Sequence, residues 1–442
     1  PVEKKVSDDA RDVQKNLTEW AKKCQWLILW LDCDREGENI AFEVVSVCTK
    51  ANTRLKVFRA TFSALTRADI EQACRTLHPP DQNQSDAVDT RSEIDLRIGA
   101  SFTRFLTLRY RSKVQLPSPT VSYGPCQSPT LGFVVDRFVE VESFVREPFW
   151  SIKVTIHKED TARGPDAPPV AVNFTWERQR LFDRLCVLIL YEACLEQPLA
   201  TVTEVKGSET RRRRPVPLCT VEMHKAASRK LRMTSAQCMS VAEALYQRGI
   251  ISYPRTETEV FAPTMDLVSL VEPHKDSSVW GEYARRLTDG GEFQWPRDGP
   301  RDDKAHPPIH PLKLMEKSDL ENDDEWKLYE FITRHFLACC SEDALGFETR
   351  VTIDIAGENF YTTGLTVLER RWLDVYPYEQ WSGAYVPRFL QGETVMPSSI
   401  TVSESYTEPP PLLSEADLID LMDKNGIGTD ATMHDHIKTI QV

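Results

Sequence analysis

The sequence predicts a multidomain protein in which an α/β unit, a β-rich unit and helical units follow one another along the chain. Its 442 residues exceed what one compact core usually holds, and roughly 100–200 residues per domain suggests about two to four units. Residues 24–45 combine an apolar strand with an amphipathic helix, whereas residues 149–208 and 348–406 alternate in hydropathy. A helical stretch, 219–345, lies between the two strand-rich segments. We therefore expect one β-rich domain split by a helical insertion.

The N-terminal α/β unit is expected to close near His78. Its strand CQWLILWL runs into the acidic turn DCDREGEN and a helix, and a second strand lies within KVFRATFSALT. Beyond it, residues 85–144 favour helices, because apolar side chains recur at three- and four-residue steps at Ile94, Ile98, Phe102 and Phe105. With the later patterns, these features divide the chain into 1–78, 79–144, 145–218, 219–345, 346–408 and 409–442.

The strands of the β-rich unit are predicted from segments in which apolar and polar residues alternate. These segments are FWSIKVTIH, VAVNFTW, LATVTEV, ETRVTIDIAG and PSSITVSESY, and LCVLILYEACL predicts one short helix among them. The last part of the chain predicts a helix at EADLIDLMDK. This helix begins at the capping-box pair Ser414 and Asp417 and ends at Asn425 and Gly426.

Composition places the chain among ordinary globular proteins, with 41% hydrophobic and 27% charged residues. No apolar run approaches the roughly 20 residues of a membrane-spanning helix. The 11 scattered cysteines indicate reduced thiols in an intracellular protein. A net charge of −13 counts against a nucleic-acid binder, but the placement of basic residues decides such binding, and Arg211–Arg214 are four consecutive arginines. Phosphate contact and a solvated turn are equally compatible with that run.

The acidic turn contains the first candidate site. Asp32, Asp34 and Glu36 follow a buried-looking strand, and ligands bind at the carboxyl ends of strands in α/β sheets. Magnesium prefers a few carboxylates together with water and phosphate oxygens. We therefore expect a Mg²⁺ site here, with Arg35 available to meet a phosphate.

An EF-hand is the competing interpretation of the same residues. Asp32, Asp34, Glu36, Gly37 and Glu43 fall at positions 1, 3, 5, 6 and 12 of that calcium loop. Against it, an apolar strand stands where an EF-hand needs its entering helix. A solvated acidic turn without chemistry remains a further alternative.

The loop IISYPRTET contains the candidate nucleophile. Pro254 stiffens the loop between Tyr253 and Arg255. Cationic neighbours lower the pKa of a phenol, and a guanidinium can neutralise phosphate oxygens during transfer. Taken alone, a tyrosine after two apolar residues is more often a packing residue.

His306 lies in AHPPIHP, where prolines stiffen the loop. It can donate a hydrogen bond to a phosphate oxygen or to an aspartate of the acidic turn, or be an ordinary loop histidine. His310 follows four residues later, but the intervening prolines exclude the helical spacing of a metal pair. Arg91 and Asp95 stand four apart on a helical stretch and can pair there.

Taken together, these motifs resemble those of type IA DNA topoisomerases, in the same order. LDCDREGEN resembles the Toprim metal motif, SYGPCQSPTLGFVVDRF a strand-passage hinge segment, ISYPRTET the nucleophile loop and AHPPIHP the catalytic-histidine loop, and GIGTDAT completes the set. Longer segments, among them YEFITRHFLACCSEDA and LDVYPYEQW, are most similar to the eukaryotic topoisomerase III alpha branch. The resemblance covers nearly the whole chain.

This resemblance implies a four-domain torus and an ATP-independent enzyme that relaxes negative supercoils and decatenates recombination intermediates. It implies that Tyr253 forms a 5′-phosphotyrosine, with Arg255 and His306 assisting and with Asp32, Asp34 and Glu36 holding Mg²⁺ for religation. The DNA-binding residues that it implies are Arg35, Arg91, Asp95, Ser122, Gln127 and Thr130. The sequence contains no Walker A motif, which agrees with an enzyme that does not use ATP.

The sequence departs from the family at both ends. Family members begin their Toprim domain with a strand and loop that carry a glutamate and a lysine, and nothing similar precedes Cys24. We expect the N-terminal piece to be missing, the chain to stop inside the last helical domain, and the 442-residue chain alone to be inactive or nearly so.

Several partners follow from the resemblance. They are single-stranded DNA, a RecQ-family helicase and OB-fold cofactor proteins, in the nucleus and also the mitochondrion. The remaining alternatives are a Toprim-type metal-dependent nuclease and a calcium- or DNA-binding module without chemistry.

Overall fold

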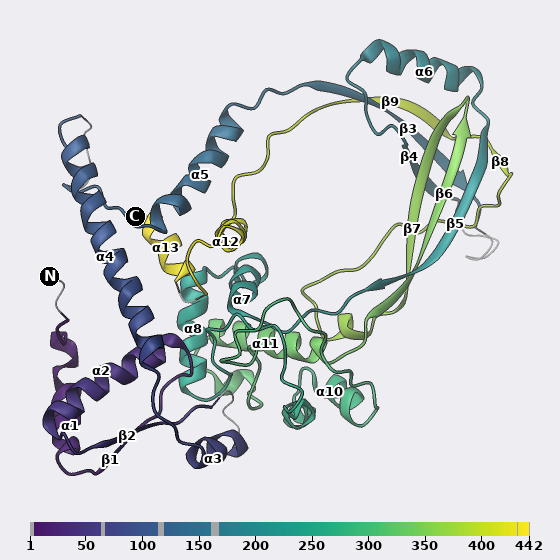
Figure 1. Cartoon of the computed structure of the whole chain (residues 1–442). Helices are drawn as coiled ribbons and strands as arrows, with labels where there is room; N and C mark the ends of the chain where they lie inside the picture. The colour runs from purple at the N-terminus through teal and green to yellow at the C-terminus, as the bar shows by residue number, and fades with distance from the viewer. Residues whose placement is uncertain (1–3, 63–66, 114–118, 161–167, 431, 442) are drawn as a thin grey trace.

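The computed structural model describes residues 4–62, 67–113, 119–160, 168–430 and 432–441. Its ribbon runs from an α/β unit through two helices into an arch of long strands, descends to a helical base, returns through the arch and ends beside the base (Figure 1). This arrangement confirms the predicted combination of α/β, β-rich and helical units. No helix among the described residues is long and apolar enough to cross a membrane.

The α/β unit is built around two parallel strands joined by a helix. Its elements are η1 (Asp8–Ala10), α1 (Arg11–Ala21), β1 (Trp26–Leu29), α2 (Arg35–Ala51), β2 (Lys56–Arg59) and α3 (Arg67–Arg75). The strands are shorter than the apolar runs suggested, and β1 is not buried on both faces. Trp26 is 53% exposed and Ile28 44%, whereas Leu29 is buried, so one face of the strand pair stays open.

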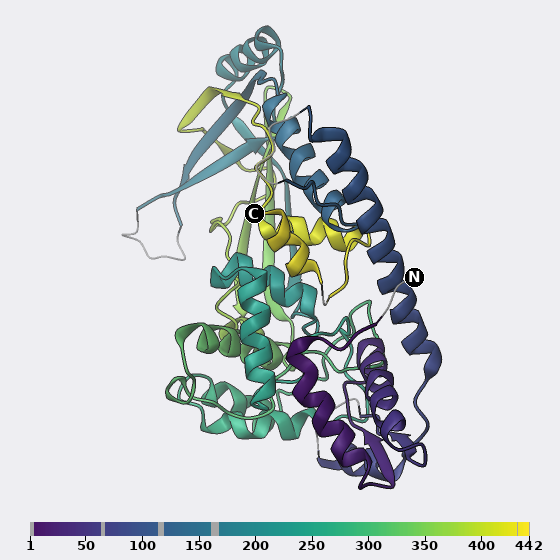
Figure 2. The ribbon, with the colours of Figure 1, turned by 90° about the vertical axis from the view of Figure 1, so that its left-hand side faces the viewer.

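Two helices connect this unit to the arch, α4 (Gln82–Tyr110) and α5 (Gln127–Glu142). They are separate helices, since α4 ends at Tyr110 and α5 begins at Gln127. Figure 2 shows α4 running along one side of the molecule, from the α/β unit toward the arch. The apolar stripe on α4 is exposed, with Phe105 at 61%.

The arch contains a single antiparallel sheet. Its strands are β3 (Pro148–Lys158), β4 (Val170–Trp176), β5 (Ala200–Arg212), β6 (Ala344–Ile355), β7 (Glu358–Glu369), β8 (Thr394–Val395) and β9 (Ser399–Tyr406). Their order is β8-β5-β6-β7-β4-β3-β9, with the helix α6 (Arg184–Glu196) packed nearby. Because β5 pairs with β6 from Thr201↔Asp354 to Arg212↔Ala344, the sheet joins segments on both sides of the helical insertion. The split β-rich unit is therefore confirmed.

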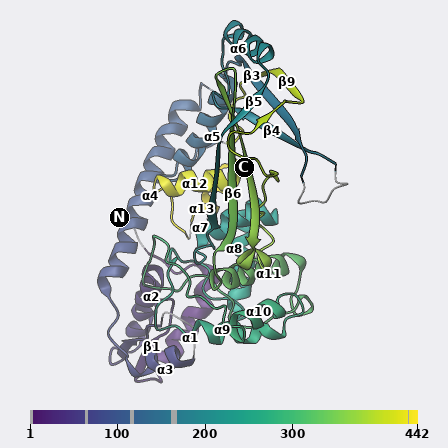
Figure 3. The same ribbon diagram turned by 90° about the vertical axis from the view of Figure 1, so that its right-hand side faces the viewer.

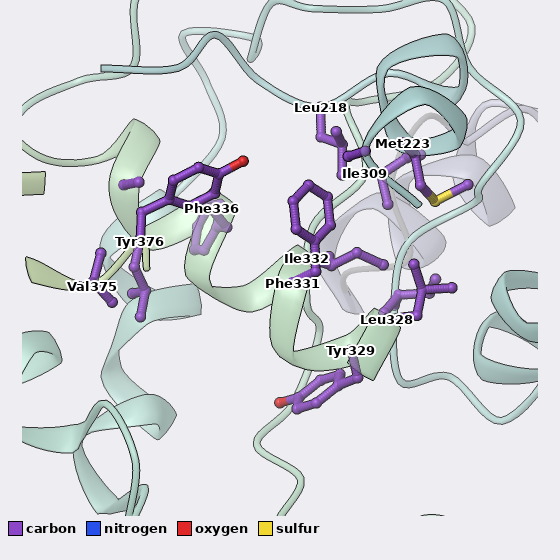
Figure 4. Packing of buried hydrophobic residues seen from close by; sticks show 14 of the residues in the cluster. Leu218, Met223, Ile309, Leu328, Tyr329, Phe331, Ile332, Phe336, Val375 and Tyr376 are labelled. Carbon is purple, nitrogen blue, oxygen red and sulfur yellow. The ribbon is translucent and has the colours of Figure 1, made fainter. Parts of the chain in front are cut away.

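The helical insertion surrounds its own core. It consists of α7 (Thr220–Ala226), a π-helical turn η3 (Ala227–Leu231), α8 (Ser235–Gln247), α9 (Leu267–Val271), η4 (Glu272–Asp276), α10 (Gly281–Thr288), η5 (Lys317–Asp319) and α11 (Asp323–Cys339), with η6 (Arg371–Asp374) just beyond β7. Figure 4 shows Leu328, Phe331 and Ile332 of α11 facing Leu218, Met223 and Ile309. This packing fixes the segments that contain Leu218 and Ile309 against α11.

The chain closes with α12 (Glu415–Lys424) and α13 (Met433–Ile440). The predicted capping box is present, because Ser414 accepts from the Asp417 N–H and Asp417 accepts from Ser414. Asn425 ends α12, and Gly426 follows with a φ of 64°. Leu418 and Ile437 pack with Val221 of α7, so the two helices lie between the base and α5 (Figure 3).

Candidate active site

The acidic turn is fixed at the N-terminus of α2. Asp34 is the N-cap residue, and its Oδ1 accepts from the Gly37 N–H at 2.7 Å. A Cβ at position 37 would stand 2.1 Å from the backbone oxygen of Asp32. The close approach requires glycine at this position, and it folds the turn so that Asp32 and Asp34 leave the same end of β1.

The side chain of Arg59 holds this turn in place through hydrogen bonds. Its guanidinium is 1% exposed, pairs with Glu38 at 2.8 Å, and donates to the carbonyls of Leu31 at 2.8 Å and Asp32 at 2.6 Å. Glu38 also accepts from the Asp81 N–H at 2.6 Å. A buried ion pair whose arginine also donates to backbone carbonyls fixes the ends of the strands in position.

The EF-hand interpretation is wrong. Helix α2 already begins at Arg35, so Glu36, Gly37 and Glu43 lie in one continuous helix and not in a calcium-binding loop. The preceding element is the strand β1 and not an entering helix.

Tyr253 comes from the helical insertion and meets the acidic turn. Its half-buried ring lies 4.5 Å from the ring of His306 and 5.2 Å from that of Tyr246, measured between centroids. The Tyr246 hydroxyl donates to Asp32 Oδ1 at 3.1 Å. Tyr253 therefore is a packing residue, as expected for a tyrosine that follows two apolar residues. The groups that it packs against, however, can act in catalysis.

The electrostatic surroundings of Tyr253 differ from the expectation. Burial raises the pKa of the phenol, and Asp34 and Asp32 raise it further. Arg255 lowers the pKa, but the net effect is upward. Arg255 therefore acts in the direction suggested by the sequence, but burial and the two aspartates outweigh it, and Tyr253 is a neutral phenol at pH 7.

Arg255 is oriented by a carboxylate on α8. Its Nε donates to Glu243 Oε1 at 3.0 Å, and the pair forms a salt bridge. The same guanidinium lowers the pKa of His224, although burial is the larger cause. Arg255 therefore lies among Tyr253, Glu243 and His224.

His306 presents an unused nitrogen. The residue is 8% exposed, and within the described part of the chain its Nε2 has no hydrogen-bond partner. The expected bond to an aspartate of the acidic turn is thus not formed. Burial lowers the pKa of His306, although Asp34, Asp303 and Asp32 act in the opposite direction. The ring is neutral at pH 7 and available to a ligand.

Asp303 ties the two loops of the site together. Its Oδ2 accepts from the Thr256 hydroxyl at 3.0 Å and from the Glu257 N–H at 3.2 Å. Its Oδ1 accepts from the N–H groups of Ala305 at 2.8 Å and His306 at 3.0 Å. One carboxylate therefore fixes the nucleophile loop relative to the histidine loop.

The expected metal ligands are only partly brought together. Asp32 and Asp34 both act on Tyr253 and His306, whereas Glu36 pairs with Arg91 of α4 at 2.8 Å. In the ranges that the structure describes, no group of three acidic, histidine or cysteine residues is arranged to hold a metal. Two carboxylates suffice for Mg²⁺, which keeps water and phosphate oxygens as its other ligands, so the donor chemistry fits.

The expected DNA-binding residues lie in different settings. Arg35 is exposed at the start of α2. Arg91 pairs with Glu36 and not with Asp95, which instead acts on His436 of α13.

The three remaining candidates lie at the entrance to α5. Ser122 is exposed in the preceding loop, and Gln127 is the first residue of the helix. Thr130 is buried, and its hydroxyl donates to the Cys126 carbonyl at 2.7 Å. Contact with DNA stays a prediction for all of these residues.

Four residues of the candidate site were not identified from the sequence. Tyr246, Glu243, Asp303 and Arg59 reach the site only through folding. The acidic residue Asp303, three residues before His306 in a loop, offered the single usable signal.

Two known domain families match the chain. A Toprim domain matches residues 2–65, and the DNA topoisomerase family matches residues 79–442. The chain belongs to the type IA DNA topoisomerases. The expected family is therefore confirmed.

Individual relatives agree with this family. DNA topoisomerase 3-alpha of Mus musculus is 49% identical and that of Arabidopsis thaliana 47%, each over 100% of this chain but 43% and 48% of their own lengths. DNA topoisomerase 3 of Schizosaccharomyces pombe is 41% identical over 99% of this chain and 69% of its own length. The chain thus spans about half the length of the first two relatives.

A solved structure shares the fold. The full-length topoisomerase I from Thermotoga maritima matches 99% of this chain and 69% of its own, with a TM-score of 0.75 and 24% identity. The type IA fold is confirmed by this likeness.

Proposed function

We propose that this type IA topoisomerase chain carries the site that cuts and reseals one DNA strand through Tyr253. The observation that carries the proposal is the meeting of Tyr253 and His306, from the helical insertion, with Asp32 and Asp34 of the Toprim domain. Residues with these chemistries come from two separate units and face one another.

The proposed cleavage is a transesterification. The Tyr253 oxygen attacks the phosphorus and bonds to the 5′-phosphate, while the bond between that phosphorus and the 3′ oxygen of the neighbouring nucleotide breaks. The proton that the phenol loses is balanced by the proton that the departing 3′ oxygen gains, so no net proton is consumed. Religation reverses each bond change. The phosphotyrosine conserves the phosphodiester energy, which is why strand passage, relaxation of negative supercoils and decatenation of recombination intermediates need no ATP.

Arg255 and His306 act on the transferred phosphate in this proposal. Arg255, held by Glu243, neutralises charge on the non-bridging oxygens. The free Nε2 of neutral His306 donates to one of these oxygens when its tautomer places the proton there. Both residues stabilise the transferred group without changing their own protonation.

We propose that Mg²⁺ binds at Asp32 and Asp34, with Glu36 at the edge of the site. The ion would offset negative charge at the phosphate during religation. It would also counter the two carboxylates that raise the pKa of Tyr253.

Partners and location follow the family in this proposal. Single-stranded DNA is the substrate, with Arg35, Arg91, Asp95, Ser122, Gln127 and Thr130 as its contacts. A RecQ-family helicase and OB-fold proteins assist in the nucleus and the mitochondrion. The domain boundaries are proposed as 1–78, 79–144, 145–218, 219–345, 346–408 and 409–442.

Covalent trapping tests the proposal. Full-length protein is denatured during reaction with labelled single-stranded DNA, and we expect label on the 5′-phosphate side of the break to remain attached to protein. Tyr253→Phe is expected to abolish this adduct. Tyr246→Phe serves as the matched control, because the ring of Tyr246 lies 5.2 Å from that of Tyr253 between centroids, and a variant that loses only the Tyr246 hydroxyl should still yield an adduct.

Two outcomes would refute the assignment. An adduct that persists in Tyr253→Phe means that another residue is the nucleophile. Free, metal-dependent cleavage products without any adduct mean that the chain is a Toprim-type nuclease that uses water.

A further inference from the structure

Four cations line the junction between the arch and the helical insertion. They are Arg211 at the end of β5, Arg213 just beyond it, Arg297 in the loop before the histidine loop, and Lys230 in η3; we call them the basic track. This junction lies where the lower ends of β5, β6 and β7 meet α11 (Figure 1). None of the four residues belongs to the proposed cleavage site.

The track is concave and continuous. One hollow of about 450 Å³ is lined by Arg211, Arg213 and Arg297, and a second of about 280 Å³ by Arg297 and Lys230. Because Arg297 lines both, the two hollows adjoin. A chain-like ligand can therefore follow them in sequence.

The cations of the track lack carboxylate partners within the described ranges. Arg211 and Arg213 are exposed and form no ion pair there. Arg297 donates to the Arg214 carbonyl at 2.7 Å, and Lys230 donates to the Tyr376 hydroxyl at 3.0 Å.

The acids at the junction are already engaged. In the first hollow, Glu342 pairs with Arg371, and Asp343 accepts from the Arg214 N–H at 3.0 Å. In the second hollow, Glu222 pairs with Lys225 and Glu379 with Arg212. The track therefore keeps its positive charge within a protein of net charge −13.

A partly exposed tryptophan, Trp295, lies two residues before Arg297 of the track. Trp295 is 38% exposed, and its carbonyl accepts from Arg214 Nη2 at 2.8 Å. Guanidinium groups bind phosphates, and exposed aromatic rings stack on unpaired bases. Arginines beside an exposed tryptophan favour a single strand over a duplex, whose bases are stacked inside.

We propose that the basic track is a second binding site for single-stranded DNA, in which Arg211, Arg213, Arg297 and Lys230 contact successive phosphates and Trp295 stacks on a base. The inference rests on the proposed DNA substrate but not on the cleavage chemistry. A strand held here lies outside the cleavage site and is not the strand being cut there.

Salt-dependent binding tests the track. A labelled oligonucleotide of about 40 nucleotides can reach both sites, whereas one of about 8 nucleotides occupies one site at a time. For the long oligonucleotide, Arg211→Ala with Arg213→Ala should reduce the slope of log affinity against log salt by about 1.4 and weaken binding about tenfold at low salt. Binding of the short oligonucleotide should fall to the part that the cleavage site alone provides.

Three further variants keep the test specific. Arg211→Lys with Arg213→Lys retains the charges and should restore the wild-type slope. Trp295→Ala should weaken binding of the long oligonucleotide about tenfold with an unchanged slope. Arg146→Ala with Arg285→Ala removes two exposed arginines elsewhere and should behave like wild type.

The outcomes separate this proposal from the proposed function. If the Arg211→Ala, Arg213→Ala variant binds the long oligonucleotide with wild-type affinity and slope, the track is refuted. If the wild-type protein binds it with the expected slope but no adduct forms at Tyr253, the cleavage proposal fails and the track stands.

Discussion

The ring of His306 lies against the ring of Tyr253 with centroids 4.5 Å apart and planes tilted by 44°. The two residues sit in different loops of the helical insertion, and Asp303 links these loops through four hydrogen bonds. The contact places the unpartnered Nε2 of His306 beside the candidate nucleophile. The geometry and its consequences can be tested residue by residue.

Replacing His306 should slow DNA cleavage without disturbing the fold. His306→Ala removes a donor to the transferred phosphate, and loss of one such donor costs about 10²–10³-fold in rate. Single-turnover formation of the covalent adduct measures this effect. His157→Ala, at an exposed histidine of the arch, should leave the rate unchanged. A fall of less than about threefold in His306→Ala would contradict the proposed role.

Asp34→Asn should separate the two roles of that residue. Asparagine caps helices as well as aspartate does, so α2 should keep its N-terminus. The lost charge should raise the Mg²⁺ concentration needed for half-maximal religation by about tenfold or more. Glu36→Gln should have a smaller effect, because Glu36 is already paired with Arg91. Equal effects of the two variants would instead indicate three equivalent ligands.

Asp303→Asn should uncouple the two loops. Partial burial would raise the pKa of Asp303, but hydrogen bonds from the backbone of His306 and Ala305 lower it overall. Because the folded-state pKa is depressed, the carboxylate stabilises the loops above about pH 4 and loses this effect as pH falls. Cleavage at neutral pH should fall about 10²-fold, since small displacements of reacting groups are costly.

The neighbouring Asp302 provides the control for this variant. Its Oδ1 accepts only from the Lys304 N–H, at 2.9 Å, and does not reach the nucleophile loop. Asp302→Asn should therefore cut DNA at the wild-type rate. Similar losses in both variants would mean that the charge of the loop matters and not its connection.

Much of the fold could be predicted because it depends on local patterns. Alternating hydropathy located most strands of the arch, and Ser414 with Asp417 located the start of α12. The strand β7 was not singled out, because ENFYTTGLTVLE mixes polar and apolar residues irregularly. The exposure of Trp26 was not foreseen either, because a strand's apolar run does not reveal whether both faces are covered.

The site was predictable only where a motif carried it. Tyr253, His306 and the acidic turn stand in recognisable segments, whereas Tyr246 and Glu243 are ordinary residues of an amphipathic helix. The net pKa of Tyr253 could not be predicted, because the sequence pointed to Arg255 as a neighbour and the fold added burial, Asp34 and Asp32, which act in the opposite direction. Such balances depend on tertiary distances that no local pattern contains.

Gly37→Ala should disrupt the acidic turn. Its Cβ would stand 2.1 Å from the Asp32 backbone oxygen, so the strand end or the helix must move. We expect a loss of about 1–3 kcal/mol in the free energy of unfolding and a weaker response to Mg²⁺. Gly132→Ala is the matched helical control, because a Cβ there meets nothing within 4 Å, and it should be neutral or stabilising. Chemical denaturation of both variants distinguishes steric conflict from helix propensity.

Acid should destabilise the helical insertion through His224. Burial is the main cause that lowers the pKa of this residue to about 3, with His434 and Arg255 adding to it. Because the pKa of His224 in the folded chain lies below 6.5, His224 becomes protonated in the unfolded chain while it stays neutral in the folded one. The free energy of unfolding therefore falls as the pH drops below 6.5. Between pH 6.5 and 5 the loss is about 2 kcal/mol for this one residue.

His224→Leu should remove that part of the acid sensitivity. The variant's free energy of unfolding, followed by tryptophan fluorescence, to which the buried Trp280 contributes, should change less between pH 6.5 and 5 than that of the wild type, by about 2 kcal/mol. His157→Leu alters an exposed histidine and should keep the wild-type pH dependence. If His224→Leu and wild type lose stability equally with acid, the neutral state of the buried His224 is not what makes the insertion sensitive to pH.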